Sequence, residues 1–573
     1  MTPNGPSRRP YGRMVALALL LVLAAFLRFS HLSERGLLEV DEGFYTQGAR
    51  SYVALGSYVV ERLQGSLNEG LASYFEAHGG TTHLSEKPTF LILGYVAALV
   101  LGFQDYTLLY LSAFFGTLTV GLIYLVGCTI FERRDTALLS AFFVAISPLH
   151  IAFSRSAYPN VTATALTWLA VLVYLKALDA SPRSGARWRL ASGALVGLAY
   201  TVHSGFFWLP LILFCSEGIR LAGRVRQESF GRAAAAMGRL AVATALPLLL
   251  WEAVFQVGRW VLGTNPVWAA ALQRPTGEAV FYTYFESLML WFRSDALVLS
   301  SAFLEPFYYV KLLYTHEAWF VFILAVLGLV VIAANAYRAG TAGWAWVVAL
   351  FLIPLGTFSF MDFGGPRHMV VVVPAMCLLA ARGAVWLIDF VAPDGLRVQM
   401  LHLGVKTAIA ALVLALQVGC IQEILAIRGN YQAAIDFMNR NGGVKHLSDR
   451  MYVGRVYVGR SNAIDHFFSL RASDADMGRH QISLEKLKQV YADGYRYLVR
   501  HSRQPAVVPP YDNELVTITE SGQVQPEFTV SQPVGWYWPA SICRSDRDAG
   551  IPQELQVFSI ETVIQNLERE MTG

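Results

Sequence analysis

Residues 107–155 read TLLYLSAFFGTLTVGLIYLVGCTIFERRDTALLSAFFVAISPLHIAFSR. Two apolar runs, 107–130 and 136–153, lie on either side of the basic pair Arg133 and Arg134. Each run is long enough to cross a bilayer as a helix, because about 20 apolar residues span the hydrocarbon core. Short loops rich in arginine stay on the cytoplasmic side of a membrane. The stretch therefore predicts two membrane helices joined by a cytoplasmic loop.

The whole chain has the composition of a membrane protein. Of its 573 residues, 55% are hydrophobic and only 15% are charged, whereas soluble domains carry roughly 25% charged residues. This balance excludes a disordered protein and argues against a purely soluble enzyme. The lysines and arginines form short clusters between apolar runs, so the net charge of +4 reflects membrane topology. We therefore expect no nucleic-acid partner.

The first apolar run extends from Met14 to about Phe29 and follows Arg8, Arg9 and Arg13. Such a start is also typical of a secretory signal peptide, but no small-residue cleavage motif follows it. We expect an uncleaved first helix whose N-terminus lies in the cytoplasm. Further apolar segments lie at 161–179, 190–202, 205–219, 239–257, 317–337, 343–360, 369–390 and 400–424.

The number of membrane crossings depends on two ambiguous segments. The basic connectors should all be cytoplasmic, and they agree with one another only if 88–103 does not cross and 190–219 forms a hairpin. We therefore predict a polytopic α-helical membrane protein with about 11 transmembrane helices, in a range of roughly 10 to 13. The basic connectors are Arg133–Arg134, Arg183–Arg189 and Arg220–Arg232.

Two long polar loops fall on the outer side of the membrane under this topology. The first outer loop, 30–87, is too long for a turn, and long structured loops are usually functional. The second, 258–316, contains the aromatic-rich pieces Ala279–Phe292 and Phe303–Leu313. These pieces predict either interfacial helices or a mobile flap over a lipid-facing cavity.

The composition changes after the last apolar segment. We expect a transmembrane module at 1–429 and a soluble α/β domain at 430–573 on the outer face, because short apolar runs there alternate with charged and Gly- or Pro-containing stretches. Asp474-Ala475-Asp476 matches a metal-binding DxD pattern that is common by chance. The apolar runs are Met451–Val458, Arg496–Val499, Leu515–Ile518 and Leu555–Ile560.

The five cysteines of the chain form no CxxC pair. Four of them lie in apolar segments or at their ends, and Cys543 stands alone near the C-terminus. We expect neither a disulfide framework nor a structural zinc site.

Adjacent carboxylates, Asp41 and Glu42, follow the first span almost directly. Carboxylates at a membrane surface are often simply solvated. A carboxylate on a structured loop beside an apolar cavity, however, binds protons more tightly through desolvation, which suits a general base. The pair also permits a division of work, in which one residue acts as the base and the other hydrogen-bonds an acceptor.

A second group of ionisable residues closes the first outer loop. Lys87 lies where the chain re-enters the membrane, and Pro88 after it favours the first turn of a helix. Lys87 either snorkels to lipid headgroups or binds the phosphate of a lipid-linked substrate. His83 and Glu86 are candidate ligands for a divalent metal ion, although two ligands do not make a site.

Further outer residues are candidate phosphate ligands. Arg155 and Arg367 are either interfacial arginines or phosphate clamps, because a phosphoryl group near a bilayer requires fixed cations. His203 interrupts an apolar hairpin and is either a polar turn residue or part of the site. His368 follows Arg367 directly.

Several motifs in this order resemble the GT-C membrane glycosyltransferases. The most similar groups are the dolichyl-phosphate-mannose protein mannosyltransferase-like enzymes, glycosyltransferase family 39, and the lipid A aminoarabinose transferases. The likeness extends over about 14–390 and is strongest over 36–210. The motifs are Asp41-Glu-Gly-Phe-Tyr45, Glu86-Lys87-Pro88, Phe131-Glu-Arg-Arg134, Ile146-Ser-Pro-Leu-His-Ile-Ala-Phe-Ser-Arg155, Leu195–Gly205 and Pro366-Arg367-His368.

This resemblance implies an inverting enzyme that moves a sugar from a polyprenyl phosphate to an acceptor on the outer side of the cytoplasmic, or inner, membrane. It implies Asp41 as the catalytic base, Glu42 as its assistant and Lys87 as a phosphate ligand. Glu86 matches a metal-binding glutamate of the aminoarabinose branch. Asn160 stands where that branch carries an aspartate and lacks its charge, and His203 stands where relatives commonly carry lysine.

We expect the donor phosphate to belong to an amphiphile. Its expected ligands are Lys87, Arg155, His203, Arg367 and His368. An enzyme that uses such a donor needs a cavity open to the bilayer with cations at headgroup depth, and no nucleotide site. The expected partners are therefore a polyprenyl-phosphate-linked sugar, membrane lipids and an acceptor. The acceptor is a protein hydroxyl, lipid A or another glycan, and the sugar is a hexose, a pentose or an amino sugar.

Two other functions remain open at this point. The alternative is a membrane transporter or lipid flippase with outer gating carboxylates. Transporters usually place ionisable groups near the midplane, often in paired repeats, whereas here these groups lie at one surface and no clear repeat is found. The third possibility is a non-catalytic scaffold whose C-terminal domain binds a partner.

Overall fold

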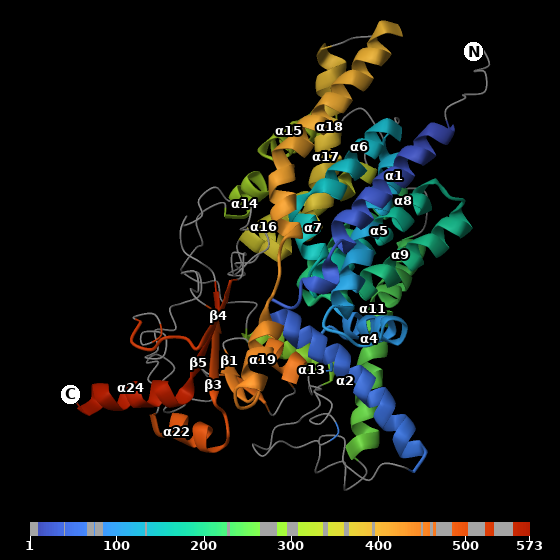
Figure 1. Ribbon diagram of the computed structural model, residues 1–573. Coiled ribbons are helices and arrows are strands. Elements are labelled where there is room, and N and C mark those ends of the chain that lie inside the picture. The colour runs from blue at the N-terminus through green and yellow to red at the C-terminus, as the bar shows by residue number, and fades with distance from the viewer. Residues whose placement is uncertain are drawn as a thin grey trace.

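The structure is a computed structural model of the chain (Figure 1). Its most extensive part is a bundle of helices, which is joined at one end to a smaller unit that contains a β-sheet. The residues described are 10–38, 40–65, 74, 84–131, 134–225, 230–263, 283–294, 308–335, 342–359, 366–391, 396–448, 451–458, 462–465, 484–501, 519, 522–531 and 554–572.

The apolar segments of the sequence form the helices of the bundle. Helix α5 matches its predicted run, and α8 begins one residue before the predicted run. The helices are α1 (Pro10–Phe29), α5 (Thr107–Ile130), α6 (Arg134–Ile146), α7 (Pro148–Ser154), α8 (Asn160–Asp179), α9 (Pro182–Val202), α10 (Trp208–Val225), α11 (Phe230–Gly263), α15 (Trp319–Asn335), α16 (Ala342–Ser359), α17 (Val372–Val391) and α18 (Leu396–Leu425).

The chain is an integral membrane protein. Within the described residues, seven helices are long and apolar enough to cross a membrane, and two bent pairs raise this number to nine if each pair is one span. Two further apolar helices, α4 (Pro88–Leu101) and Gly343–Ser359 of α16, are shorter than these spans. The polytopic helical fold is confirmed, and the exact number of crossings stays a prediction.

One predicted membrane segment, 136–153, is a broken helix. Helices α6 and α7 meet at a bend of 59°, because Pro148 cannot donate the backbone hydrogen bond that would continue α6. The buried carboxylate of Glu317 instead accepts hydrogen bonds from Ser147 Oγ at 2.6 Å and Leu149 N at 3.1 Å. The buried Arg28 donates to carbonyl groups at the end of α6. Both ends of the break are thus satisfied inside the bundle.

The two predicted outer loops contain helices. The first holds the short helix η1 (Leu32–Glu34) and α2 (Val40–Leu63), which crosses beneath one end of the bundle in Figure 1. The second holds α13 (Tyr284–Ser294) and α14 (Tyr308–His316), which overlap the predicted amphipathic pieces. Two further short helices, η2 (Ser204–Phe206) and η3 (Pro366–Val371), lie at breaks between longer helices.

The C-terminal residues form a five-stranded mixed sheet with helices. The strand order is β2-β1-β3-β5-β4, in which β1 is parallel to β2 and β3, and β5 is antiparallel to β3 and β4. Its elements are α19 (Tyr431–Arg440), β1 (His446–Ser448), α20 (Met451–Val458), β2 (Ala463–Asp465), α22 (Leu484–Ala492), β3 (Tyr497–His501), β4 (Phe528–Ser531), β5 (Glu554–Ser559) and α24 (Ile560–Thr572).

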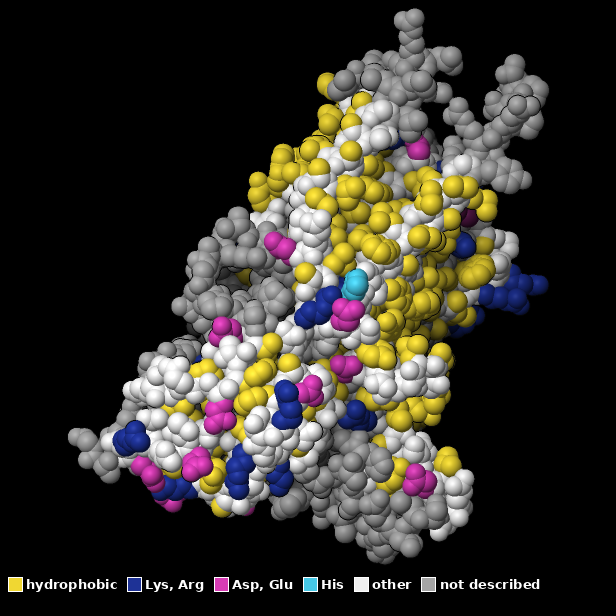
Figure 2. Space-filling view, in the orientation of Figure 1, with side chains coloured by type: hydrophobic (Ala, Val, Ile, Leu, Met, Phe, Trp, Pro, Cys, Tyr) yellow, Lys and Arg dark blue, Asp and Glu magenta, His cyan; other side chains and the backbone are white. Residues whose placement is uncertain are grey.

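This C-terminal unit has the α/β composition expected, whereas its solubility, its outer location and its boundary at 430 stay predictions. Leu515–Ile518 and Asp474–Asp476 lie outside the described residues. The surface in Figure 2 supports a division, since hydrophobic side chains cover the bundle and charged ones gather over the C-terminal unit. Exposed large hydrophobic residues are indeed frequent on α1, α11 and α18.

The expectation about the cysteines needs one correction. Cys420, near the end of α18 that leads to the C-terminal unit, is disulfide-bonded. Spacing along the sequence missed this bond, because a disulfide requires only that two cysteines meet in space.

Candidate functional site

Asp41 lies in the first turn of α2, where the positive end of the helix dipole favours a carboxylate. Its Oδ2 forms an ion pair with Arg367 Nη1 of η3 at 2.5 Å. The Asp41 side chain is 38% exposed and that of Arg367 is 25% exposed. The guanidinium of Arg367 also lies over the ring of Tyr158, 5.1 Å from its centre. The structure therefore joins two predicted site residues that are more than 300 positions apart in the sequence.

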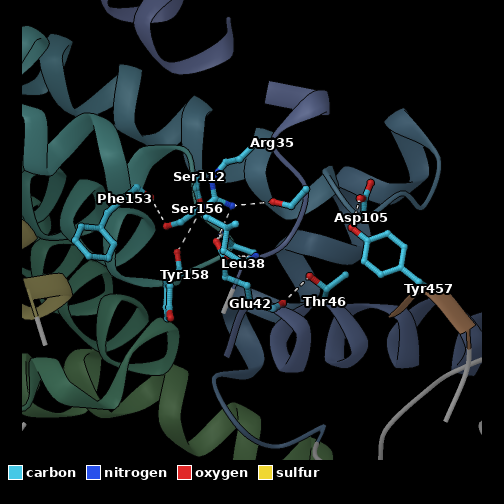
Figure 3. Close-up of polar contacts among 12 residues, drawn as sticks. Arg35, Leu38, Glu42, Thr46, Asp105, Ser112, Phe153, Ser156, Tyr158 and Tyr457 are labelled. Carbon is cyan, nitrogen blue, oxygen red and sulfur yellow. Dashed lines mark hydrogen bonds and ion pairs between the residues drawn. The ribbon is translucent and has the colours of Figure 1, made fainter. Parts of the chain in front are cut away.

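Glu42, the next residue, points into packed protein. Its Oε1 pairs with Arg35 Nη1 at 2.9 Å and accepts a hydrogen bond from Ala157 N at 3.0 Å. Its Oε2 accepts from Leu38 N at 2.8 Å. Figure 3 shows Glu42 among these groups, at the junction of the link before α2 and the link after α7. Its carboxylate is fully buried, so Glu42 supports the turn that carries Asp41.

Lys87 lies at the end of the first outer loop, immediately before α4. Its Nζ donates a hydrogen bond to the hydroxyl of Tyr45 and lies 4.3 Å from the centre of that ring. Tyr45 is one helical turn after Asp41 on α2, so both side chains lie on the same side of the helix. Burial raises the pKa of Tyr45 well above its ordinary value, and the charge of Asp41 raises it further. Tyr45 thus stays neutral beside the lysine.

Two histidines lie next to these cations. The rings of His203 and His368 are 6.2 Å apart, and His368 stacks on Phe358 at 4.7 Å. His203 Nδ1 accepts a hydrogen bond from Gly205 N at 2.9 Å, which leaves the proton on Nε2. Burial lowers the pKa of His203 well below its ordinary value, and the positive charge of Lys87 lowers it further. His203 is therefore a neutral donor near Lys87.

A shallow open cleft extends from Lys87 and Glu86 to α13. It lies between the start of α4, the end of α9 and the second outer loop. Trp251 of α11 donates to Thr89 at 2.8 Å and thereby ties α11 to this wall. The cleft is rich in hydroxyl groups, which come from Ser85, Tyr200, Thr201, Ser204, Tyr284 and Ser287.

Arg155 and Asn160 lie next to the site but are buried, whereas Asp41 and Arg367 are partly exposed. Arg155 is buried, and its Nη1 donates to the carbonyl of Ser30 at 2.7 Å and to that of Arg28 at 3.3 Å. It therefore holds the end of α1. Asn160 Nδ2 donates to the backbone carbonyl of Arg367 at 3.2 Å, while its buried Oδ1 has no hydrogen-bond partner. Asn160 thus supports the backbone of η3.

The metal assignment stays a prediction. Among the residues that the structure describes, no three His, Cys, Asp or Glu side chains form a group suited to a metal ion. Glu86 lines the cleft, and Asn160 contacts Arg367 instead of Glu86 in the hydrogen bonds seen. His83 lies outside the described residues.

The site thus has one cluster with a cleft at its side. Asp41, Lys87, His203, Arg367 and His368 converge, whereas Arg155 and Glu42 face packed backbone. Reasoning from sequence missed three residues that shape the cluster. Tyr45 could have been found from its spacing of four after Asp41, but Arg35 and Tyr158 carry no sequence signal for their ionic and ring contacts. These residues are Arg35, Tyr45 and Tyr158.

Residues 88–251 match the dolichyl-phosphate-mannose-protein mannosyltransferase family. This match includes α4, α5 and the broken helix α6–α7, and it covers less than a third of the chain. It begins directly after Lys87, so Asp41 lies outside it. No curated protein matches the sequence.

Solved structures of membrane glycosyltransferases share the fold. The oligosaccharyltransferase AglB of Archaeoglobus fulgidus, in complex with an inhibitory peptide and a dolichol-phosphate, has a TM-score of 0.56 at 12% identity over 86% of this chain and 69% of that chain. ArnT of Cupriavidus metallidurans in the apo state has a TM-score of 0.52 at 14% identity over 97% and 98%. ArnT bound to undecaprenyl phosphate has the same TM-score and identity over 96% and 98%.

At these identities the likeness establishes the fold and not the substrates. The covered shares show that the likeness to ArnT extends through the C-terminal unit and is not confined to the bundle. The expected resemblance to GT-C glycosyltransferases is confirmed by the family match and by these structures.

Proposed function

We propose that this chain is an inverting glycosyltransferase that moves a sugar from a polyprenyl phosphate to a hydroxyl acceptor on the outer side of the membrane. One observation carries the proposal: an accessible carboxylate, Asp41, lies beside the cations Arg367 and Lys87 at the end of an apolar helical bundle. That combination suits a reaction in which one group leaves as a phosphate and another must lose a proton.

The donor phosphate would bind at Lys87. This ammonium group lies at the mouth of the hydroxyl-rich cleft, and Arg367 and the neutral His203 lie near it. The negative charge on a leaving phosphate grows as the glycosidic bond breaks, so fixed cations lower the barrier. Undecaprenyl phosphate and dolichol-phosphate, named in the ArnT and AglB structures, are phosphates of this chemical class.

Asp41 would act as the general base. Its partly exposed carboxylate is available to an acceptor hydroxyl, whereas the buried carboxylate of Glu42 is occupied by Arg35 and two backbone N–H groups. A base that deprotonates the acceptor as it attacks the sugar from the side opposite the phosphate gives inversion. Proton removal by a positioned group contributes typically about 10²–10⁴-fold to a rate. Glu42 then assists by fixing the turn of α2.

Two observations support an outer location of the site. The disulfide at Cys420 lies near the end of α18 that leads toward the site and the C-terminal unit, and disulfides persist in oxidising compartments outside the cytoplasm. The second observation is the set of arginine-rich connectors, which are expected to lie on the cytoplasmic side and therefore leave the site on the outer side. We propose an inner-membrane protein whose C-terminal unit lies in the periplasm or its equivalent.

The experiment is transfer from labelled donors by the full-length protein in nanodiscs. A panel of polyprenyl-phosphate hexoses, pentoses and amino sugars is offered with cell-envelope fractions that contain protein, lipid A or other glycans. Label that moves into one fraction supports the proposal and identifies sugar and acceptor. Label that crosses the bilayer of a proteoliposome without reaching any acceptor would favour the transporter or flippase. Glu561→Gln, which changes an exposed carboxylate of α24, is the control.

A further inference from the structure

The start of α2 is contacted by the C-terminal unit as well as by the bundle. Tyr457 of α20 donates a hydrogen bond from its hydroxyl to Asp105 Oδ2 at 2.7 Å. Asp105 lies in the link between α4 and α5. Arg50 of α2 donates to the carbonyl of Val456 at 2.9 Å and lies 4.8 Å from the centre of the Phe103 ring. Helix α20 is thus fastened between α2 and the α4–α5 link.

The chain that enters the C-terminal unit also pairs with the link before α2. Gly429 N donates to the carbonyl of Arg35 at 2.6 Å, and Arg428 Nη2 forms an ion pair with Glu34 at 3.0 Å. This approach requires glycine, because a Cβ at 429 would lie 2.8 Å from the carbonyl oxygen of Leu37. The link before α2 is therefore covered by the backbone that leads from α18 into the C-terminal unit.

These contacts continue directly to Asp41. Arg35 pairs with Glu42, and Leu38 N donates to the same carboxylate. Figure 3 shows the Tyr457–Asp105 pair above α2, beyond Thr46, and Arg35, Leu38 and Glu42 at the start of that helix. The segment 35–42 is thus held by Ala157 of the bundle on one side and by Gly429, which leads into the C-terminal unit, on the other.

Tyr457 is a partly buried polar link in this junction. Its ring stacks on Tyr431 at 5.9 Å with an angle of 11° between the planes, and its hydroxyl lies 3.5 Å from where a Cβ of Gly36 would be. Gly36 has a positive φ of 66°, which few other residues adopt readily. The turn before α2 thus bends around the Tyr457 hydroxyl.

We propose that Tyr457 is a positioning residue, through which the C-terminal unit fixes the start of α2 and so the carboxylate of Asp41. The role in turnover rests on the proposed function, whereas the restraint on 35–42 does not. Because Lys87 lies immediately before α4 and not on segment 35–42, loss of the restraint slows the chemical step while donor binding persists.

The test uses variants of the full-length protein in nanodiscs. Tyr457→Phe and Asp105→Ala each remove the hydrogen bond, while Asp105→Asn keeps an acceptor oxygen. Tyr491→Phe is the matched control, since this tyrosine of the same unit donates to Glu561 at its exposed surface. Hydrogen–deuterium exchange of peptides from 34–46 reports the restraint, and kcat and donor KM report its effect on turnover.

We expect Tyr457→Phe and Asp105→Ala to raise the exchange rate of 34–46 and to lower kcat, each by about 10-fold, as for one hydrogen bond to a charged group. Donor KM stays within about twofold, Tyr491→Phe behaves as wild type, and Asp105→Asn, which keeps a neutral acceptor, falls between wild type and Asp105→Ala. The double variant Tyr457→Phe/Asp105→Ala loses no more than either single variant.

Unchanged exchange in 34–46 for both Tyr457→Phe and Asp105→Ala would overturn the proposal. So would faster exchange with an unchanged kcat, or an equal effect of Tyr491→Phe. A wild-type protein without any transfer activity would instead refute the proposed function, and the exchange measurement would then still decide whether Tyr457 restrains the start of α2.

Discussion

The two sides of the first turn of α2 differ sharply although neighbouring residues form them. On the cleft side, Asp41 is partly exposed and meets Arg367, with Tyr45 and Lys87 one turn further along. On the packed side, Glu42 is fully buried and meets Arg35 and the amides of Leu38 and Ala157. Consecutive residues of a helix point about 100° apart, so one carboxylate reaches substrate and the other reaches backbone.

The difference teaches that two identical functional groups can be assigned to chemistry and to support by their surroundings alone. An accessible carboxylate beside cations can exchange a proton with a ligand. A buried carboxylate whose oxygens are all occupied contributes to stability instead, because removing it leaves a buried charge unpaired. The two sides should therefore respond to substitution in different measurements.

The largest effect is expected at Asp41. Asp41→Asn keeps the shape of the side chain and removes the base, so the transfer rate should fall about 10²–10⁴-fold. The free energy of unfolding should change little, because the side chain is partly exposed. Transfer assays in nanodiscs and thermal unfolding of the same sample measure both. A variant that transfers sugar at the wild-type rate would remove Asp41 from the mechanism.

The next largest effect is expected on the packed side. Glu42→Ala leaves Arg35 buried without its partner, which typically costs about 3–5 kcal/mol of stability. The double variant Arg35→Met/Glu42→Leu removes both charges and should recover much of this loss. Denaturation in detergent measures the differences. If Glu42→Ala unfolds like wild type but loses transfer, Glu42 takes part in chemistry and the contrast between the two sides fails.

Lys87 distinguishes phosphate binding from contact with lipid headgroups. Lys87→Ala should raise the donor KM by about 10–100-fold, as for the loss of a charge-assisted contact to phosphate. Lys311→Ala, at an exposed lysine of α14, is the control for a lysine at the membrane surface. Equal donor KM values for the two variants would show that Lys87 only snorkels.

The smallest effect is expected on the pH dependence of stability, and it comes from His446 in the C-terminal unit. Burial lowers the pKa of His446 from 6.5 to about 4, and its Nε2 lies 3.0 Å from the hydroxyl of Tyr431, on which Tyr457 stacks. Between these two values the unfolded chain binds a proton that the folded chain does not bind. Stability therefore falls as the pH drops from 6.5 toward 4, by about 1 kcal/mol at pH 5.5.

Replacing the histidine tests this contribution. His446→Gln should remove the contribution from the pH dependence of unfolding, measured between pH 7 and pH 4.5. An identical pH dependence in both proteins would exclude His446 as its source. The result would also show whether acid loosens the unit that supports the start of α2.

Much of the bundle could be predicted from sequence, because long apolar runs such as 107–130 predict helices that lie in the membrane. The positions of Asp41, Lys87 and Arg367 at one end of the bundle also followed from the alternation of apolar and basic segments. Their contacts did not follow, because the ion pair of Asp41 and Arg367 joins distant segments. The short apolar run Met451–Val458 did not decide between helix and strand, because a run of this length fits either structure, and it forms a helix.

Arg155 shows the limit of reading a site from residue type. Its position at an outer junction predicts a phosphate clamp, and the role itself stays a prediction. In the structure its guanidinium donates to carbonyl groups at the end of α1. The last carbonyl groups of a helix have no hydrogen-bond partner within that helix. Charge and side of the membrane can be inferred from sequence, but the direction of a side chain depends on packing between α1 and α7.

The measurement that tests the central claim most directly is a structure of the full-length protein with polyprenyl phosphate bound. We predict that the phosphate lies within hydrogen-bond distance, about 3 Å, of Lys87 Nζ, on the cleft side of α2 and next to Arg367. A phosphate bound away from Lys87, or one that leaves Asp41 covered by lipid, would contradict the proposed chemistry.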